Sequence, residues 1–119
     1  MRKAIVASFL FSLLVCSASA QQAATEPLAF TIKPLGNNVF AAIKNPNSKA
    51  GSNAGFVIGD DSVAVIDTFQ DEGAARQLLA EIQKLTKLPV KFVVNTHYHL
   101  DHVTGQRRFC ASRSRYHRA

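Results

Sequence analysis

The sequence predicts a layered α/β fold, in which a β-rich start leads into a β-α-β step and a helix covers one face of the sheet. Three observations predict it: a hairpin pattern at residues 56–66, a helical apolar stripe at 71–87, and an apolar strand directly after that stripe. The length of 119 residues allows one small domain. The apolar share of 47% is typical of a globular protein and argues against a disordered or collagen-like chain.

Residues 1–20 predict a signal peptide. Two cations at positions 2 and 3 precede an apolar run over 4–16, and the small residues at 18–20 give the pattern that signal peptidase accepts before Gln21. A membrane span needs about 20 apolar residues, so an uncleaved anchor is the weaker alternative. We therefore expect a periplasmic or secreted protein with no stable membrane association after cleavage. Cleavage would also remove Cys16 and leave Cys110 without a partner for an internal disulfide.

The first half of the mature chain predicts a leader and four strands. Residues 21–29 are the leader, and short strands are expected at 30–33 and 39–43, joined by a turn rich in proline, glycine and asparagine. A flexible loop rich in asparagine, serine and glycine follows at 45–55. Strands at 56–58 and 63–66 then flank the sequence Gly-Asp-Asp-Ser, which is a hairpin signal.

The second half predicts one helix and one buried strand. A single apolar stripe at helical spacing runs through 71–87, with acidic residues at its start, lysines at its end and Pro89 after it. The stripe consists of Ala75, Leu78, Leu79, Ile82 and Leu85. The strand at 90–94 is almost continuously apolar, which is typical of a strand buried beneath helices in an α/β layer.

The chemistry-bearing residues follow that strand directly. His97, His99, Asp101 and His102 place three imidazoles and a carboxylate within six residues, and these are the ligand types of catalytic zinc sites. If the chain is extended at His97 and His99, both side chains point to the same side. A turn at Leu100 would then bring the next two ligands toward a second ion, and two adjacent metals can activate one nucleophile. The carboxyl end of a strand is also where α/β sheets place their sites.

The pattern His97-x-His99-x-Asp101-His102 resembles the signature of the metallo-β-lactamase-fold superfamily of metallohydrolases, and the resemblance covers about residues 30–105. It implies the N-terminal half of an αββα sandwich. It also implies that His97 and His99 bind a first zinc, that Asp101 and His102 bind a second, and that Asp67 supports the metal loop from below. Asp101 is in addition our candidate catalytic residue. The function implied is an exported zinc-dependent hydrolase, in which a metal-bound hydroxide attacks an ester, lactam or similar bond of a small-molecule substrate.

The family completes its site with a third histidine, a bridging aspartate and a last histidine, all from the second half of the sandwich. After His102 the sequence offers only His117 and no acid, so this chain carries half of such a site. Residues 106–119 form a basic tail without apolar periodicity. With codons chosen freely, a one-base shift from Gln106 turns this tail into an apolar helix start and strand, so we expect it to be out of frame. The alternative function is a truncated, non-catalytic chain with weak metal binding only.

The net charge of +6 does not predict nucleic-acid binding by the domain. Residues 21–105 hold seven Lys/Arg against eight Asp/Glu, and the excess of cations lies at the two ends of the chain. The alternative is a nucleic-acid-binding module that uses the tail. Its five arginines could hold phosphate, and Phe109 and Tyr116 could stack bases. The near-neutral domain and the export signal argue against it, so we expect no nucleic-acid partner.

Overall fold

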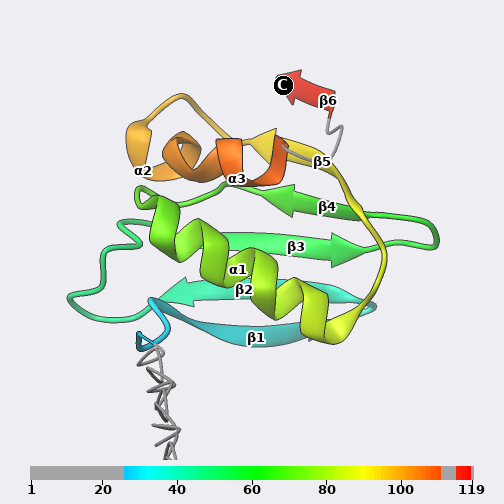
Figure 1. Ribbon diagram of the computed structural model, residues 1–119, viewed down its shortest axis with the longest axis horizontal. Coiled ribbons are helices and arrows are strands. Elements are labelled where there is room, and N and C mark those ends of the chain that lie inside the picture. The colour runs from blue at the N-terminus through cyan, green and yellow to red at the C-terminus, as the bar shows by residue number, and fades with distance from the viewer. Residues whose placement is uncertain (1–25, 111–114, 119) are drawn as a thin grey trace, which may run out of the picture.

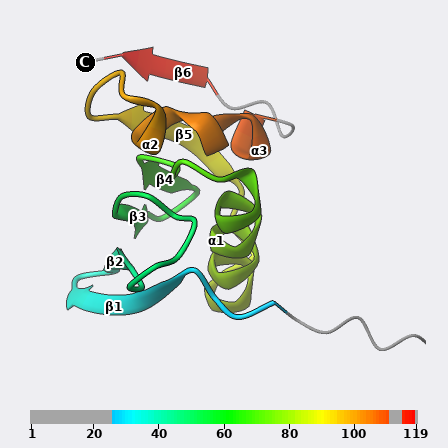
Figure 2. The same cartoon turned by 90° about the vertical axis from the view of Figure 1, so that its left-hand side faces the viewer.

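The computed structural model describes residues 26–110 and 115–118, and the predicted signal peptide lies outside them. These residues form a six-stranded sheet in the order β1-β2-β3-β4-β5-β6, with helix α1 packed on one face (Figures 1 and 2). The strands are β1 (Phe30–Gly36), β2 (Val39–Lys44), β3 (Ala54–Ile58), β4 (Val63–Ile66), β5 (Val90–Asn95) and β6 (Arg115–Arg118). The helical segments are α1 (Glu72–Leu85), α2 (Leu100–Val103), the 3-10 turn η1 (Thr104–Gln106) and α3 (Arg107–Cys110).

Strands β1 to β4 pair antiparallel through short connections, and β5 pairs parallel with β4 across the α1 crossover. The first strand is longer than predicted, because it continues through Pro34 to Gly36. Pro34 has no N–H to donate to a ladder, and it is tolerated because β1 lies at the edge of the sheet and has a bulge between Pro34 and Gly36. The predicted loop is shorter than expected, since β3 already begins at Ala54.

The predicted hairpin at 56–66 is present as β3 and β4. Its turn is closed by a hydrogen bond from the Gly59 N–H to the Ser62 carbonyl, with an N···O distance of 2.9 Å. The Asp61 carboxylate accepts from Ser62 Oγ at 2.7 Å and from Lys91 Nζ at 3.0 Å. These hydrogen bonds, first that from Ser62 and then that from Lys91, hold the pKa of Asp61 below its ordinary value.

Helix α1 begins one residue later and ends two residues earlier than the predicted range 71–87. Asp71 is its N-cap: the carboxylate accepts from the Ala74 N–H at 2.9 Å, which satisfies one of the free donors of the first turn. The helix also holds the end of the predicted leader, because the Gln77 side chain accepts from the Ala29 N–H at 2.9 Å. No helix in the described ranges is both long enough and apolar enough to cross a membrane.

The core lies between α1 and the sheet. The buried face of the helix packs onto the strand residues that point toward it, which are Ala42, Phe56, Val63, Val65 and Val93. Phe109 of α3 joins the same core with 1% of its surface exposed, although it belongs to the tail in which the sequence predicts no apolar pattern. The structure thus continues the packed domain beyond residue 105, and whether the tail is out of frame stays a prediction.

Candidate metal centre

The candidate site lies where two parallel strands end side by side. β4 ends at Ile66 and β5 at Asn95, and the Asp67 N–H donates to the Val94 carbonyl at 2.8 Å, so the segments that leave both strands are held together. Asp67 follows β4, and the histidine-rich segment follows β5 and continues into α2. All the predicted site residues therefore come from one edge of the sheet, at the carboxyl ends of its strands, where α/β folds place their sites.

Asp67 is buried beneath the histidine-rich segment and bonds to it three times. Its Oδ1 accepts from the Thr96 N–H at 2.8 Å, and its Oδ2 accepts from the Thr96 hydroxyl at 2.8 Å and from His102 Nδ1 at 2.8 Å. Asp67 has a positive φ of 55°, in the left-handed region that aspartate tolerates better than most residues. This conformation turns the chain at the end of β4 while the carboxylate accepts the three hydrogen bonds.

The three imidazoles form one cluster around His97. The ring centroid of His97 lies 4.7 Å from that of His99 and 4.0 Å from that of His102. His97 and His99 are exposed, whereas the His102 side chain retains only 20% of its accessible surface. The chain turns at Leu100 as predicted, because α2 begins at this residue. The His102 N–H donates to the His99 carbonyl at 2.9 Å. The turn thereby folds His102 back against the His97 ring.

Asp101 lies at the outer side of this cluster. One of its carboxylate oxygens is 3.5 Å from His102 Nε2, and the side chain is 40% exposed. Its main chain is held from the loop between β2 and β3, because the Ser52 hydroxyl donates to the Asp101 carbonyl. Gly51 allows this approach: a Cβ there would lie 3.3 Å from the Asp101 Cβ and 2.6 Å from the Gln70 side-chain oxygen. The loop and the histidine-rich segment therefore form one connected unit.

The short helices after the candidate ligands are anchored to the end of β4. Thr68 donates to the His102 carbonyl through both its N–H, at 2.8 Å, and its hydroxyl, at 3.0 Å. Gly105 then packs so closely that a Cβ would lie 2.0 Å from the Thr68 carbonyl oxygen. Only a residue without a side chain fits at that position. The strand-end segment 67–69 thus contacts the ligand-bearing segment near its start, at Thr96, and near its end, at His102 and Gly105.

The donor chemistry fits zinc, since imidazole and carboxylate are its ligands and the two best-held histidines keep a nitrogen free. His102 Nδ1 is occupied by Asp67, and His97 Nδ1 lies 3.0 Å from the Thr96 hydroxyl, so Nε2 is the nitrogen of each ring that is left to bind a metal. An Asp101 carboxylate oxygen lies 3.5 Å from that nitrogen of His102. Among the residues that the structure describes, no three His, Cys, Asp or Glu side chains are arranged so that they could hold a metal ion together. His117 belongs to β6, and its side chain is outside what the structure describes.

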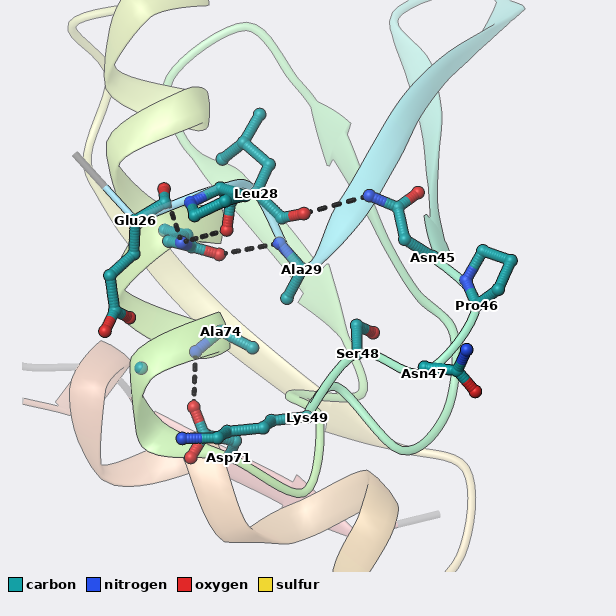
Figure 3. A pocket seen from close by; sticks show the side chains of 13 residues that line it. Glu26, Leu28, Ala29, Asn45, Pro46, Asn47, Ser48, Lys49, Asp71 and Ala74 are labelled. Carbon is teal, nitrogen blue, oxygen red and sulfur yellow. Dashed lines mark hydrogen bonds between the residues drawn. The ribbon is translucent and has the colours of Figure 1, made fainter. Parts of the chain in front are cut away.

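A separate hollow of about 490 Å³ lies on the helix side of the same sheet edge (Figure 3). It is lined by residues 26–29, by residues 45–49 of the loop, and by the first turn of α1 around Asp71. Figure 3 shows that Asp71 caps the helix there and that Asn45 donates to the Leu28 carbonyl, at 2.9 Å. The candidate metal ligands do not line this hollow, so its polar groups serve to join the leader, the loop and the helix.

Comparison with known proteins identifies the family of this chain. The model of the family described as "Metallo-beta-lactamase superfamily" matches residues 49–113, which is more than half of the chain. The chain therefore belongs to the metallo-β-lactamase superfamily. A curated relative, the linear primary-alkylsulfatase of Pseudomonas sp. (strain ATCC 19151), is 35% identical over 49 residues, which are 41% of this chain and 9% of that protein.

Solved structures show the same fold. The metallo-β-lactamase FIM-1 from Pseudomonas aeruginosa, in its mono-zinc form, superposes with a TM-score of 0.64 and 20% identity over 80% of this chain and 44% of that one. The inverting sec-alkylsulfatase Pisa1 from Pseudomonas sp. gives a TM-score of 0.61 and 22% identity over 73% of this chain and 14% of that one. The chain thus spans less than half the length of each of these relatives. The fold is that of a part of the metallo-β-lactamase architecture.

Sequence reasoning missed three residues that hold the candidate ligands in place. Thr96 donates to the Asp67 carboxylate, and Thr68 donates to the His102 carbonyl. Ser52 donates to the Asp101 carbonyl. A signal existed for Thr96, which precedes His97 directly, and for Thr68, which follows Asp67. No signal in the sequence could have found Ser52, because it is 49 residues away from the carbonyl that it contacts.

Proposed function

We propose that this chain supplies half of the metal site of an exported, zinc-dependent hydrolase of the metallo-β-lactamase superfamily. His97 and His99 would be donors to a first ion, and Asp101 and His102 to a second. The observation that carries the proposal is the cluster of three imidazoles above the buried Asp67 carboxylate, at the carboxyl ends of two parallel strands. The names of the relatives, a β-lactamase and alkylsulfatases, support a lactam or an ester as the bond to be cleaved.

Each residue of the cluster has a role that its contacts make possible. Asp67 fixes the tautomer of His102 by accepting from Nδ1, which presents Nε2 to an ion and makes the ring a better donor. Asp101 is the acidic group beside the cluster, and its side chain is 40% exposed. Its carboxylate is therefore placed to receive a proton. Zinc, when bound, would lower the pKa of a water and polarise the bond to be cleaved. The remaining donors of a binuclear site would come from residues beyond His102.

Zinc titration of the full chain tests this proposal. We expect the metal-free wild type to bind zinc, and His97→Ala or His102→Ala to weaken binding at least about tenfold, because each removes a donor. His117→Ala is the matched control, since it also removes one histidine but none of the proposed ligands. A wild type that binds no zinc, or a loss in the control as large as in the other two variants, would contradict the proposal.

A substrate panel separates the enzyme from the alternative of a non-catalytic chain. The zinc-loaded full chain is tested with a chromogenic β-lactam, a carboxylic ester and a primary alkyl sulfate, each before and after removal of the metal by a chelator. Turnover that the chelator abolishes supports the hydrolase. Zinc binding without turnover supports the non-catalytic alternative. The mass of the exported product tests the localisation, because cleavage by signal peptidase would leave Gln21 as its first residue.

A further inference from the structure

We propose that Thr96 is a positioning residue that passes the influence of Asp67 on to His97, so that one buried carboxylate fixes the tautomers of two candidate ligands. This inference rests on the proposed function, in which His97 and His102 are zinc donors. The role of Asp67 toward His102 is direct. The new step is the link to His97, which Asp67 does not contact with any hydrogen bond among those described.

The direction of this link follows from counting donors and acceptors. The Thr96 hydroxyl lies 2.8 Å from Asp67 Oδ2 and 3.1 Å from Oδ1. A carboxylate only accepts, and a hydroxyl has one hydrogen, so the hydroxyl donates that hydrogen to Asp67. The same oxygen lies 3.0 Å from His97 Nδ1 and has only lone pairs left for it. The hydrogen of the neutral His97 ring is therefore on Nδ1, and the lone pair is on Nε2.

The geometry around Asp67 supports this assignment. Besides the hydroxyl, the carboxylate accepts from the Thr96 N–H at 2.8 Å and from His102 Nδ1 at 2.8 Å. The backbone bond fixes Thr96, whose side chain is then held between the buried acid and the exposed histidine. The two rings lie next to each other, with centroids 4.0 Å apart. Both rings therefore present Nε2, and not Nδ1, as the nitrogen that can bind a metal. His102 is oriented by one hydrogen bond and His97 by two in series.

The link predicts different consequences for the two histidines when the hydroxyl is removed. Thr96→Val keeps the shape of the side chain and the backbone N–H, so the contact of Asp67 with His102 should persist. His97 loses its only described acceptor for Nδ1–H, and its ring should then exchange between both neutral tautomers. Thr96→Ser keeps the hydroxyl and should behave as the wild type.

Nitrogen NMR of the imidazole rings in the full, metal-free chain tests the proposal, at a pH at which the rings are neutral. In the wild type and in Thr96→Ser we expect His97 to show a protonated Nδ1 and an unprotonated Nε2. In Thr96→Val we expect averaged shifts for His97 and unchanged shifts for His102. Thr31→Val is the control, because it removes a hydroxyl that bonds to Asn45 at 2.8 Å, away from the histidines. A wild-type His97 with its hydrogen on Nε2 would overturn the proposal, whatever the variants do.

Zinc titration of the same proteins is the second readout. Substitution of a partner that orients a metal-ligating histidine weakens metal affinity about 10- to 100-fold, so Thr96→Val should lose about tenfold while Thr96→Ser and Thr31→Val should not. Equal zinc affinity in Thr96→Val and the wild type would overturn the positioning role. If the wild type binds no zinc while the predicted His97 tautomer is observed, the proposed function fails and the hydrogen-bond link stands.

Discussion

At the residue scale, the close approach at Gly105 is the most demanding contact between the ligand-bearing segment and the rest of the fold. A Cβ at this position would lie 2.0 Å from the Thr68 carbonyl oxygen and 2.5 Å from the Ala75 Cβ. Both partners are buried, and neither is the flexible end of a side chain. The main chain around residue 105 therefore has to move if this residue gains a side chain. This stretch of main chain directly follows the candidate ligands.

We predict that Gly105→Ala lowers the free energy of unfolding by about 1–3 kcal/mol, the usual cost of an overpacked core. Urea unfolding of the full chain, followed by circular dichroism, measures it. Gly59→Ala is the control, because a Cβ there would lie 3.2 Å from the Ser62 carbonyl oxygen and needs only a small adjustment in a turn. Equal stability of the two alanine variants would show that the structure overstates the contact at Gly105.

At the element scale, helix α1 owes its start to Asp71. The Asp71 carboxylate accepts from the Ala74 N–H. Only Gln70 separates Asp71 from the strand-end segment 67–69, which carries Asp67 and Thr68. Fraying of the first helical turn would therefore loosen the support beneath the candidate site. The sequence predicts this helix from its apolar stripe, while the capping hydrogen bond is visible only in the structure.

We predict that Asp71→Ala lowers the free energy of unfolding by about 1 kcal/mol, because it leaves the Ala74 N–H without its capping acceptor. Asp71→Ser retains a capping oxygen and should cost only a few tenths of that amount. Thermal or urea unfolding compares the two variants with the wild type. If serine and alanine destabilise the chain equally, the cap does not contribute and the charge of Asp71 matters instead.

At the scale of the whole molecule, Phe109 shows that the packed domain extends into the basic tail. Its side chain is 1% exposed and belongs to the same core as α1 and the central strands. On the outside of the same short helix, Arg108 forms an ion pair with Glu72 of α1. α3 therefore packs on the N-terminal end of α1 and covers that end of the core (Figure 2).

We predict that Phe109→Ala lowers the free energy of unfolding by about 3–5 kcal/mol, the cost of removing a fully buried aromatic ring. Phe92→Ala is the matched control and should cost less, since Phe92 is 38% exposed on the other face of the sheet. Urea unfolding of the full chain gives both values. A cost for Phe109→Ala no larger than that for Phe92→Ala would mean that the tail does not pack as the structure shows.

Much of the fold could be predicted because its signals are local. The apolar stripe defined α1 within two residues at each end, and the Gly-Asp-Asp-Ser turn identified the hairpin of β3 and β4. The extent of β1 could not be predicted, because Pro34 is compatible with a strand only when that strand lies at an edge. The packing of Phe109 could not be predicted either, since a four-residue helix has too few residues to show a periodic pattern.

The sequence by itself determined the type and the order of the candidate ligands, because the signature around His97, His99, Asp101 and His102 lies within six consecutive residues. It also indicated Asp67 as the residue beneath them. Only the tertiary structure decided how these groups are held: Asp67 bonds to Thr96 and His102, and a serine from a distant loop bonds to the Asp101 main chain. The physical reason is that these four candidate ligands are neighbours in the sequence, so their side-chain chemistry can be read from it directly. The orientation of a ring depends on hydrogen bonds between strand ends that only folding brings together.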